Sequence, residues 1–180
     1  MPHTYVVFDR STGALLGAST HYEVASGADR QQSADEVLEQ FATSLGSRNA
    51  DEVDVLEVDL PVQAIQEGFR VDTGRRTLVP KLELHLEAQR TELEGDGSDS
   101  TGIEIRAVDQ NGKTARRFAG EIQVATTRGR LDPKGGRAKA RAGKCQVTLT
   151  STAETVQRVL VTAEDPQGLC RPGVVELEFV

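Results

Sequence analysis

The sequence is poor in aromatic and sulfur-containing residues: its 180 residues include no tryptophan, two tyrosines, five phenylalanines and two cysteines. Few aromatic rings are therefore at hand to stack on sugars or bases. Two cysteines are too few for a disulfide framework in a chain of this length, and they show no metal-ligand spacing. No apolar run approaches the roughly 18 residues of a membrane helix. The N-terminus shows no secretory signal, and we expect no membrane association.

Signatures of catalysis are also missing. His3, His21 and His85 have no cysteine or acidic partner at ligand spacing, and His85 alternates with leucines as a solvent-facing strand residue would. No serine lies in G-x-S-x-G, and residues 134–136 (KGG) lack the context of a phosphate-binding loop. The acidic segment 95–100 (GDGSDS) offers fewer oxygen ligands than a calcium loop, so we interpret it as a solvated connection. We expect a non-enzymatic protein without metal or cofactor.

Charge is distributed unevenly. Residues 1–80 contain 13 acidic and 6 basic residues, whereas residues 81–180 contain 15 of each. Seven basic residues gather in residues 128–144, here called the basic segment: Arg128, Arg130, Lys134, Arg137, Lys139, Arg141 and Lys144. We interpret this segment as a loop that binds an acidic protein partner, such as the N-terminal domain of a neighbouring subunit. A nucleic-acid site is the less favoured alternative, because no aromatic residue interrupts the basic run.

Two runs of alternating residues lie within residues 143–163. Cys145, Val147 and Leu149 point one way in the first run, and Val159 and Val161 share a face in the second. The polar residues 151–155 (STAET) separate the runs. We therefore expect a β-hairpin whose apolar face is covered by a second sheet.

The first 80 residues predict a small α/β domain of ββαβ order for anchoring or oligomerisation. Residues 4–9 and 14–20 predict a hairpin in which Gly13 takes a positive φ angle. A capping box at residues 33–36 and an apolar stripe predict a helix over residues 34–45. The alternating residues 52–60 predict a strand, and a turn and a short extended run complete the domain.

Residues 81–180 predict an all-β domain, with the boundary near Pro80. About seven short strands with regular turn signals are typical of an immunoglobulin-like sandwich. Its predicted core residues share the inward-facing positions of the alternating runs: Ile103, Ile105, Ile122, Val124, Val147, Leu149, Val159, Val161 and Leu177. Cys145 and Cys170 are expected near the same end of the sandwich, as a disulfide or as two thiols.

Residues 93–180 resemble the bacterial immunoglobulin-like domains of the invasin and intimin type. The matching segments are LEGDG at 93–97, residues 103–112, residues 120–129 followed by Leu131, VTLTS at 147–151, VLVTA at 159–163 and ELEF at 176–179. The resemblance implies a sandwich of the kind used as spacers in surface adhesins and as additions to phage particles. The basic segment and the two cysteines depart from the pattern.

The opening YVVFDRSTGALLG resembles small phage-particle proteins over about 15 residues. We therefore expect a structural or accessory protein of a phage or phage-like particle, such as a capsid decoration or tail-associated protein. It would be an oligomer that docks through its N-terminal domain and is assembled in the bacterial cytoplasm. An adhesin or carbohydrate-binding module is the alternative, and a nucleic-acid binder is less favoured.

Overall fold

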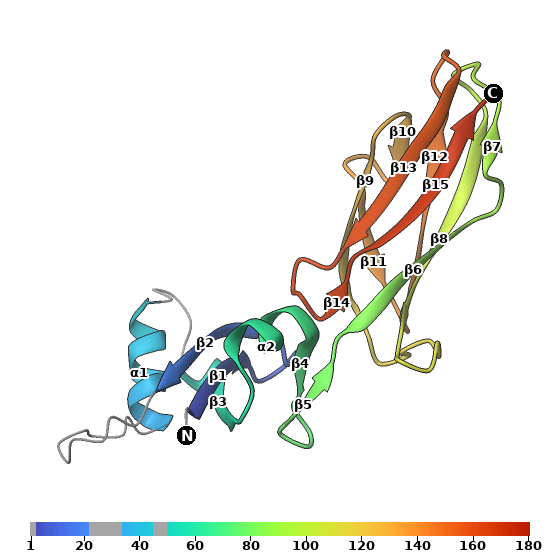
Figure 1. The fold of residues 1–180 in the computed structure, drawn as a ribbon. Coiled ribbons are helices and arrows are strands. Elements are labelled where there is room, and N and C mark those ends of the chain that lie inside the picture. Colours follow the sequence, from blue (N-terminus) through green and yellow to red (C-terminus); the bar gives the residue numbers. More distant parts are fainter. Residues whose placement is uncertain (1–2, 22–33, 45–49) are drawn as a thin grey trace. The chain divides into compact units, whose positions relative to one another are not determined.

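The computed structural model describes residues 3–21, 34–44 and 50–180. The chain divides into two compact units, Met1–Lys81 and Leu82–Val180 (Figure 1). Each unit has its own sheets and its own core, and each is described by itself below.

The N-terminal unit is built on a three-stranded antiparallel sheet in the order β2-β1-β3. Its elements are β1 (His3–Asp9), β2 (Leu15–His21), α1 (Ala34–Ser44), the 3-10 turn η1 (Ala50–Glu52), β3 (Val53–Val58), α2 (Val62–Gly68), β4 (Phe69–Asp72) and β5 (Thr77–Pro80). The last two strands pair as a separate hairpin.

The central strand β1 is buried on both faces, which explains its unbroken apolar run. Tyr5 and Val7 lie in a core with Val37 of α1. Val6 and Phe8 lie in a second core with Ile65 of α2 and with β4. The unit therefore has three layers, with one helix on each side of the sheet.

The turn between β1 and β2 joins these layers. Gly13 has a φ angle of 77°, as expected, and a Cβ atom there would lie 2.0 Å from the carbonyl oxygen of Val71. That space lets the Val71 amide donate a hydrogen bond of 3.0 Å to the Gly13 carbonyl. Burial of Asp9 tends to raise its pKa, but hydrogen bonds donated by Ser11 and Thr12 outweigh burial, so the pKa is lowered.

The sequence predicted most of this unit and missed α2. Helix α1 ends at Ser44, and its residues Val37, Leu38 and Phe41 pack on the sheet as the stripe predicted. Ser33 of the capping box lies outside the described residues. Helix α2 has seven residues and buries Ile65, so it offers no repeating apolar stripe to recognise.

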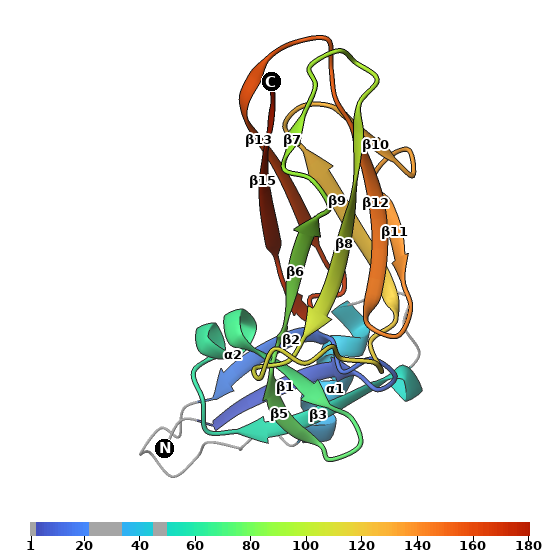
Figure 2. The same cartoon turned by 90° about the vertical axis from the view of Figure 1, so that its right-hand side faces the viewer.

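The C-terminal unit is a sandwich of two five-stranded sheets (Figures 1 and 2). Sheet one has the order β10-β12-β8-β6-β14, and sheet two has the order β11-β9-β13-β15-β7. The strands are β6 (Leu82–Ala88), β7 (Glu92–Leu93), β8 (Ser100–Val108), β9 (Gly120–Thr126), β10 (Arg130–Asp132), β11 (Arg137–Ala140), β12 (Lys144–Thr150), β13 (Val156–Glu164), β14 (Cys170–Arg171) and β15 (Gly173–Phe179). Neighbours are antiparallel except for the pairs β14–β6 and β15–β7.

The core between the two sheets confirms the predicted inward-facing residues. All nine predicted core residues are buried, with at most 2% of each exposed. Phe179 and Leu93, which were not predicted, are also buried there. Wherever the sequence showed alternating apolar residues, the alternation correctly predicted which face of the strand is buried.

The predicted hairpin within residues 143–163 is wrong. Strand β12 pairs with β8 and β10 in sheet one, whereas β13 pairs with β9 and β15 in sheet two. Residues 151–155 cross from one sheet to the other. Alternation shows which face of a strand is buried. Two strands that face one core from different sheets show the same alternation as two strands of a hairpin, so the pattern does not distinguish them.

The buried Leu149 allows a direct test of the sandwich. Leu149→Ala should lower the free energy of unfolding by about 2–5 kcal/mol, because transfer energy is lost and a cavity remains. Thr148→Ala, on the outer face of the same strand, should change it by only about 0.5 kcal/mol. Urea unfolding followed by circular dichroism measures both. Equal losses in the two variants would contradict the facing of β12.

Candidate interaction surface of the sandwich

The outer face of sheet one carries charges that are paired with one another. Arg106 of β8 donates a hydrogen bond of 2.9 Å to Glu87 of β6 and forms an ion pair of 3.4 Å with Glu104. Lys144 of β12 also forms an ion pair of 3.4 Å with Glu104. Further along this face, Glu83 lies 3.8 Å from both His85 and Arg171. The charged side chains on β12, β8, β6 and β14 therefore form an ion-pair ladder facing solvent, which consists of two groups, one around Arg106 and one around Glu83.

The outer face of sheet two has a different character. Ala125, Thr162 and Val174 lie opposite one another on β9, β13 and β15, and Leu160 follows beside them. Val174 is 59% exposed, one of the few large apolar side chains so exposed among the described residues. These four residues are called the neutral strip. Such an apolar patch on an open sheet face marks a candidate contact surface.

A basic hollow of about 290 Å³ lies on the β9 side of β13. Its lining combines two arginines with apolar and hydroxyl side chains: Thr127, Arg128, Val156, Arg158 and Leu160. Thr127 is fixed to Leu160, since each backbone amide bonds an oxygen of the other residue at 3.0 Å. The hydrogen-bonded pairing of β9 with β13 therefore continues into the floor of this hollow.

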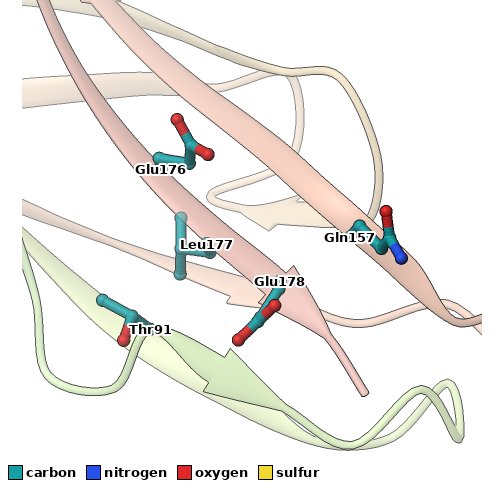
Figure 3. A pocket seen from close by; sticks show the side chains of 5 residues that line it. All are labelled: Thr91, Gln157, Glu176, Leu177 and Glu178. Atoms are coloured by element: carbon teal, nitrogen blue, oxygen red, sulfur yellow. The ribbon is translucent and has the colours of Figure 1, made fainter.

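An acidic hollow of about 230 Å³ lies on the β15 side of β13. It is lined by Thr91, Gln157, Glu176, Leu177 and Glu178. Figure 3 shows Glu176 and Glu178 on β15, Gln157 on the neighbouring strand and Thr91 just before β7. The two hollows thus flank the start of β13, with opposite charge.

An irregularity in β13 separates the hollows. The pairing register between β13 and β15 shifts between Val156 and Val159, so the consecutive residues Gln157 and Arg158 are both exposed. Gln157 lines the acidic hollow and Arg158 lines the basic hollow. Arg158 also forms an ion pair of 3.1 Å with Glu176 between them.

The basic segment is not a single loop, which corrects the sequence interpretation. It contains the edge strand β10 of sheet one and the edge strand β11 of sheet two. The sequence RAKA alternates, and Ala138 and Ala140 are buried on the inner side. Alanine is a weak strand signal, so the charges concealed this alternation.

The seven basic residues are all exposed but are not brought to one place. Arg130 and Lys144 belong to sheet one, and Lys144 is paired with Glu104. Arg137 and Lys139 project from β11, and Arg137 lies 3.8 Å from Glu121. Arg128 alone lines the basic hollow. Lys134 and Arg141 lie in the turns on either side of β11.

The structure contradicts the expected proximity of Cys145 and Cys170, and no disulfide joins them. Cys145 on β12 and Cys170 on β14 are separated by β8 and β6. Three strand intervals of about 4.8 Å place their Cα atoms at least about 14 Å apart, beyond the roughly 4.4–6.8 Å of a disulfide. The error follows from the hairpin, which wrongly placed β12 and β13 in one sheet. Burial raises the pKa of the Cys145 thiol to about 11.

Intact mass spectrometry checks both thiols. The denatured, unreduced protein should take up two alkyl groups. In the folded protein Cys145 should react slowly at neutral pH, because its raised pKa leaves little thiolate. A mass shift of zero in the denatured sample would contradict the separation of the two strands.

The remaining sequence candidates for a metal site can be placed only in part. His85 is exposed on the face of sheet one as predicted, and the side chains of His3 and His21 lie outside the described residues. Among the described residues no group of three or more potential ligands gathers. Asp96 instead accepts hydrogen bonds from Ser98 and from the Asp99 amide, which is a turn stabilised from within.

Asp99 fixes the wall of the acidic hollow. Its carboxylate accepts bonds of 2.5 Å and 3.3 Å from Arg90 and of 2.9 Å from the Glu94 amide. Arg90 and Glu94 flank β7, and the Thr91 carbonyl in this segment accepts a bond of 2.8 Å from the Glu178 amide. The hydrogen bonds from Arg90, followed by that from Glu94, lower the pKa of Asp99 to about 2.

This lowered pKa predicts a pH-dependent contribution to stability. The ionised Asp99 stabilises the fold above its unfolded pKa of about 3.9, and the contribution is lost as pH falls through about 2. Asp99→Asn should therefore lower Tm at pH 7, and the difference should vanish near pH 2. Thermal unfolding at several pH values measures this. Glu164→Gln, an exposed control on β13, should show no comparable difference; a deficit for Asp99→Asn that persists at pH 2 would contradict the role of the charge.

Strand order and the shared core together identify the architecture of the C-terminal unit. Two facing sheets, with consecutive strands β12 and β13 divided between them, enclose one core. This unit is an immunoglobulin-like β-sandwich. Over the described residues the chain is mainly β, with a small α/β unit that precedes the sandwich in the sequence.

Comparison with known proteins found low-identity matches among solved structures. A C-terminal intimin fragment in complex with the intimin-binding domain of the translocated intimin receptor (Tir) is 20% identical, with a TM-score of 0.44 over 54% of this chain and 33% of that chain. The D0-D1 domain of intimin is 21% identical, with a TM-score of 0.44 over 55% of this chain and 48% of that chain. A family 2 glycosyl hydrolase from Bacteroides cellulosilyticus is 16% identical, with a TM-score of 0.48 over 97% of this chain and 22% of that chain.

The chain thus spans less than half of the length of these structures. No family model matches it, and no curated protein matches it. None of the three structures is a phage-particle protein, and likenesses of this degree carry no argument about function. Among the described residues, no helix is long and apolar enough to cross a membrane.

The residues that sequence reasoning missed as site candidates are Leu160, Val174, Arg158, Glu176 and Glu178. A signal for them exists in GVVELEF, where Val174, Glu176 and Glu178 alternate with residues facing the core. Arg158 has the same signal, since it alternates with the buried Val159 and Val161, whereas Gln157 is out of phase because of the register shift in β13.

Proposed function

We propose that this chain is a non-enzymatic binding module whose sandwich contacts a protein partner through the outer face of sheet two. The difference between the two outer faces carries this proposal. Both faces carry ion pairs, but sheet two also presents an exposed neutral strip, and two hollows of opposite charge lie next to that strip on either side of β13. A face with apolar and charged contact groups fits the composition of protein interfaces.

The chemistry of the hollows favours a protein partner over a glycan or a nucleic acid. Neither hollow includes an aromatic residue in its described lining, so neither can stack on a sugar ring or a base. The carboxylates of Glu176 and Glu178 would repel nucleic-acid phosphates beside the basic hollow. Carbohydrate binding and nucleic-acid binding are therefore the weaker proposals.

The absence of an enzymatic role belongs to the same proposal. Both hollows are open to solvent, and their described lining holds neither a histidine nor a cysteine that could act as a nucleophile or as its base. Their carboxylates lie on an exposed strand rather than in a dry cleft. This arrangement suits recognition more than acid–base chemistry.

We favour a surface-displayed, adhesin-like setting over a phage particle. The particle expectation depends on a likeness of about 15 residues in the N-terminal unit. The contact face of the sandwich is independent of that likeness and would serve any displayed protein that holds a partner. The fold itself decides nothing between the two settings.

Site-specific photocrosslinking tests the contact face. A photoreactive residue in place of Val174, on sheet two, should give a discrete crosslinked product in the cells that naturally make the protein. The same residue in place of Gln146, which is exposed on sheet one, is the matched control and should give none. Products from Gln146 alone, or none from Val174, would overturn the proposed face.

A further inference from the structure

We propose that the partner of this face is a second copy of the chain. Two copies would pack sheet two against sheet two, around a two-fold axis that lies in the interface and runs along β13. This inference rests on the proposed function, since it uses the same face, and it names the partner.

The positions of the two hollows carry the inference. The basic hollow lies on the β9 side of β13. The acidic hollow, shown in Figure 3, lies on the β15 side near the same end of the strand. A two-fold axis along β13 exchanges these sides between the facing copies. Each basic hollow then lies opposite an acidic hollow, and the same contact forms twice, as in every isologous interface.

The charged groups at these positions are available for a partner. Within the described part of the chain, Arg128 and Glu178 form no ion pair. Arg158 and Glu176 pair with each other, but their side chains are 68% and 56% exposed. An exposed pair contributes little to stability, so exchanging it for a pair across an interface costs little.

The centre of the face suits close contact. Ala125, Leu160, Thr162 and Val174 carry no charge, and Glu176, which lies opposite Leu160, is paired with Arg158. The five strands of sheet two have 4, 7, 9, 7 and 2 residues, and at about 3.3 Å by 4.8 Å for each residue their face covers roughly 460 Å². Two such faces bury an area below the usual range of stable interfaces, so we expect a weak, reversible dimer.

Other surfaces of the sandwich are less suited to self-association. The face of sheet one pairs its own charges. At the edge of sheet two, Arg137 and Lys139 project from β11 and disfavour edge-to-edge pairing with a like strand. The neutral strip, together with the hollows of opposite charge on the two sides of β13, is therefore the self-complementary feature of this unit.

Sedimentation velocity over a range of protein concentrations tests the dimer. The complete chain should associate reversibly at low salt and more weakly at high salt. Arg128→Glu and Glu178→Arg should each weaken self-association at least about tenfold, because either change places like charges opposite one another twice. A chain that remains monomeric at about 1 mM would overturn the inference.

An equimolar mixture of the two variants tests whether position 128 of one copy faces position 178 of the other. In the mixed dimer the carboxylate introduced at position 128 of one copy faces the guanidinium introduced at position 178 of the other. The second contact keeps the native Arg128 opposite the native Glu178, so wild-type affinity should return. Arg130→Glu makes the same charge change on sheet one and should leave association unchanged. Failure of the mixture to recover, or an equal loss in Arg130→Glu, would place any dimer contact elsewhere. Circular dichroism confirms that each variant is folded.

The two proposals fail separately. A monomeric chain whose Val174 position crosslinks to a different protein would end the homodimer inference and leave the proposed binding face intact. Absence of any product from Val174 would end the proposed face itself. Loss of association on reversing Arg137 and Lys139, but not Arg128, would indicate the basic edge strand as the contact and would also overturn the homodimer inference.

Discussion

The apolar contact between the two inner sheet faces is the constraint on which the C-terminal unit depends. Leu149 on β12 and Val159 on β13 are completely buried in it, from opposite sheets. Because side chains alternate along a strand, burial of one set fixes which residues face solvent. The ion-pair ladder on sheet one and the neutral strip on sheet two are therefore both consequences of core packing. A change of register by one residue would remove both.

The sequence predicted this core correctly and the strand pairing incorrectly. Alternation carries information about burial at each residue, and the nine predicted core positions needed nothing more. Which strands pair depends on two segments at once. The alternation around Val147 or Val161 shows that each is buried, but it does not show which strand lies beside it. The polar residues 151–155 can turn back within a sheet or cross to the facing sheet. The wrong choice produced both the hairpin and the expected proximity of Cys145 and Cys170.

The candidate site was hard to foresee for a different reason. The basic segment drew attention through its composition, yet its residues are divided between the edges of two sheets. Charged side chains on an exposed edge strand commonly prevent pairing with a strand of another molecule. This role accounts for Arg137 and Lys139 on β11 without a binding partner. Composition alone therefore wrongly suggested that the basic residues form one binding surface. The less conspicuous VVELEF, with only two charges, supplies Val174, Glu176 and Glu178 to the face argued for here.

The irregularity in β13 links the fold to recognition. In a regular strand, Gln157 and Arg158 would point to opposite faces, and one of them would enter the core. The shifted register leaves both exposed, so neither polar group is buried and both hollows gain a side chain. Bulges often re-aim side chains at functional sites in this way. The register shift in β13 thus keeps both polar side chains out of the core. At the surface it leaves opposite charges on either side of one strand. This is the arrangement that a two-fold contact along β13 requires.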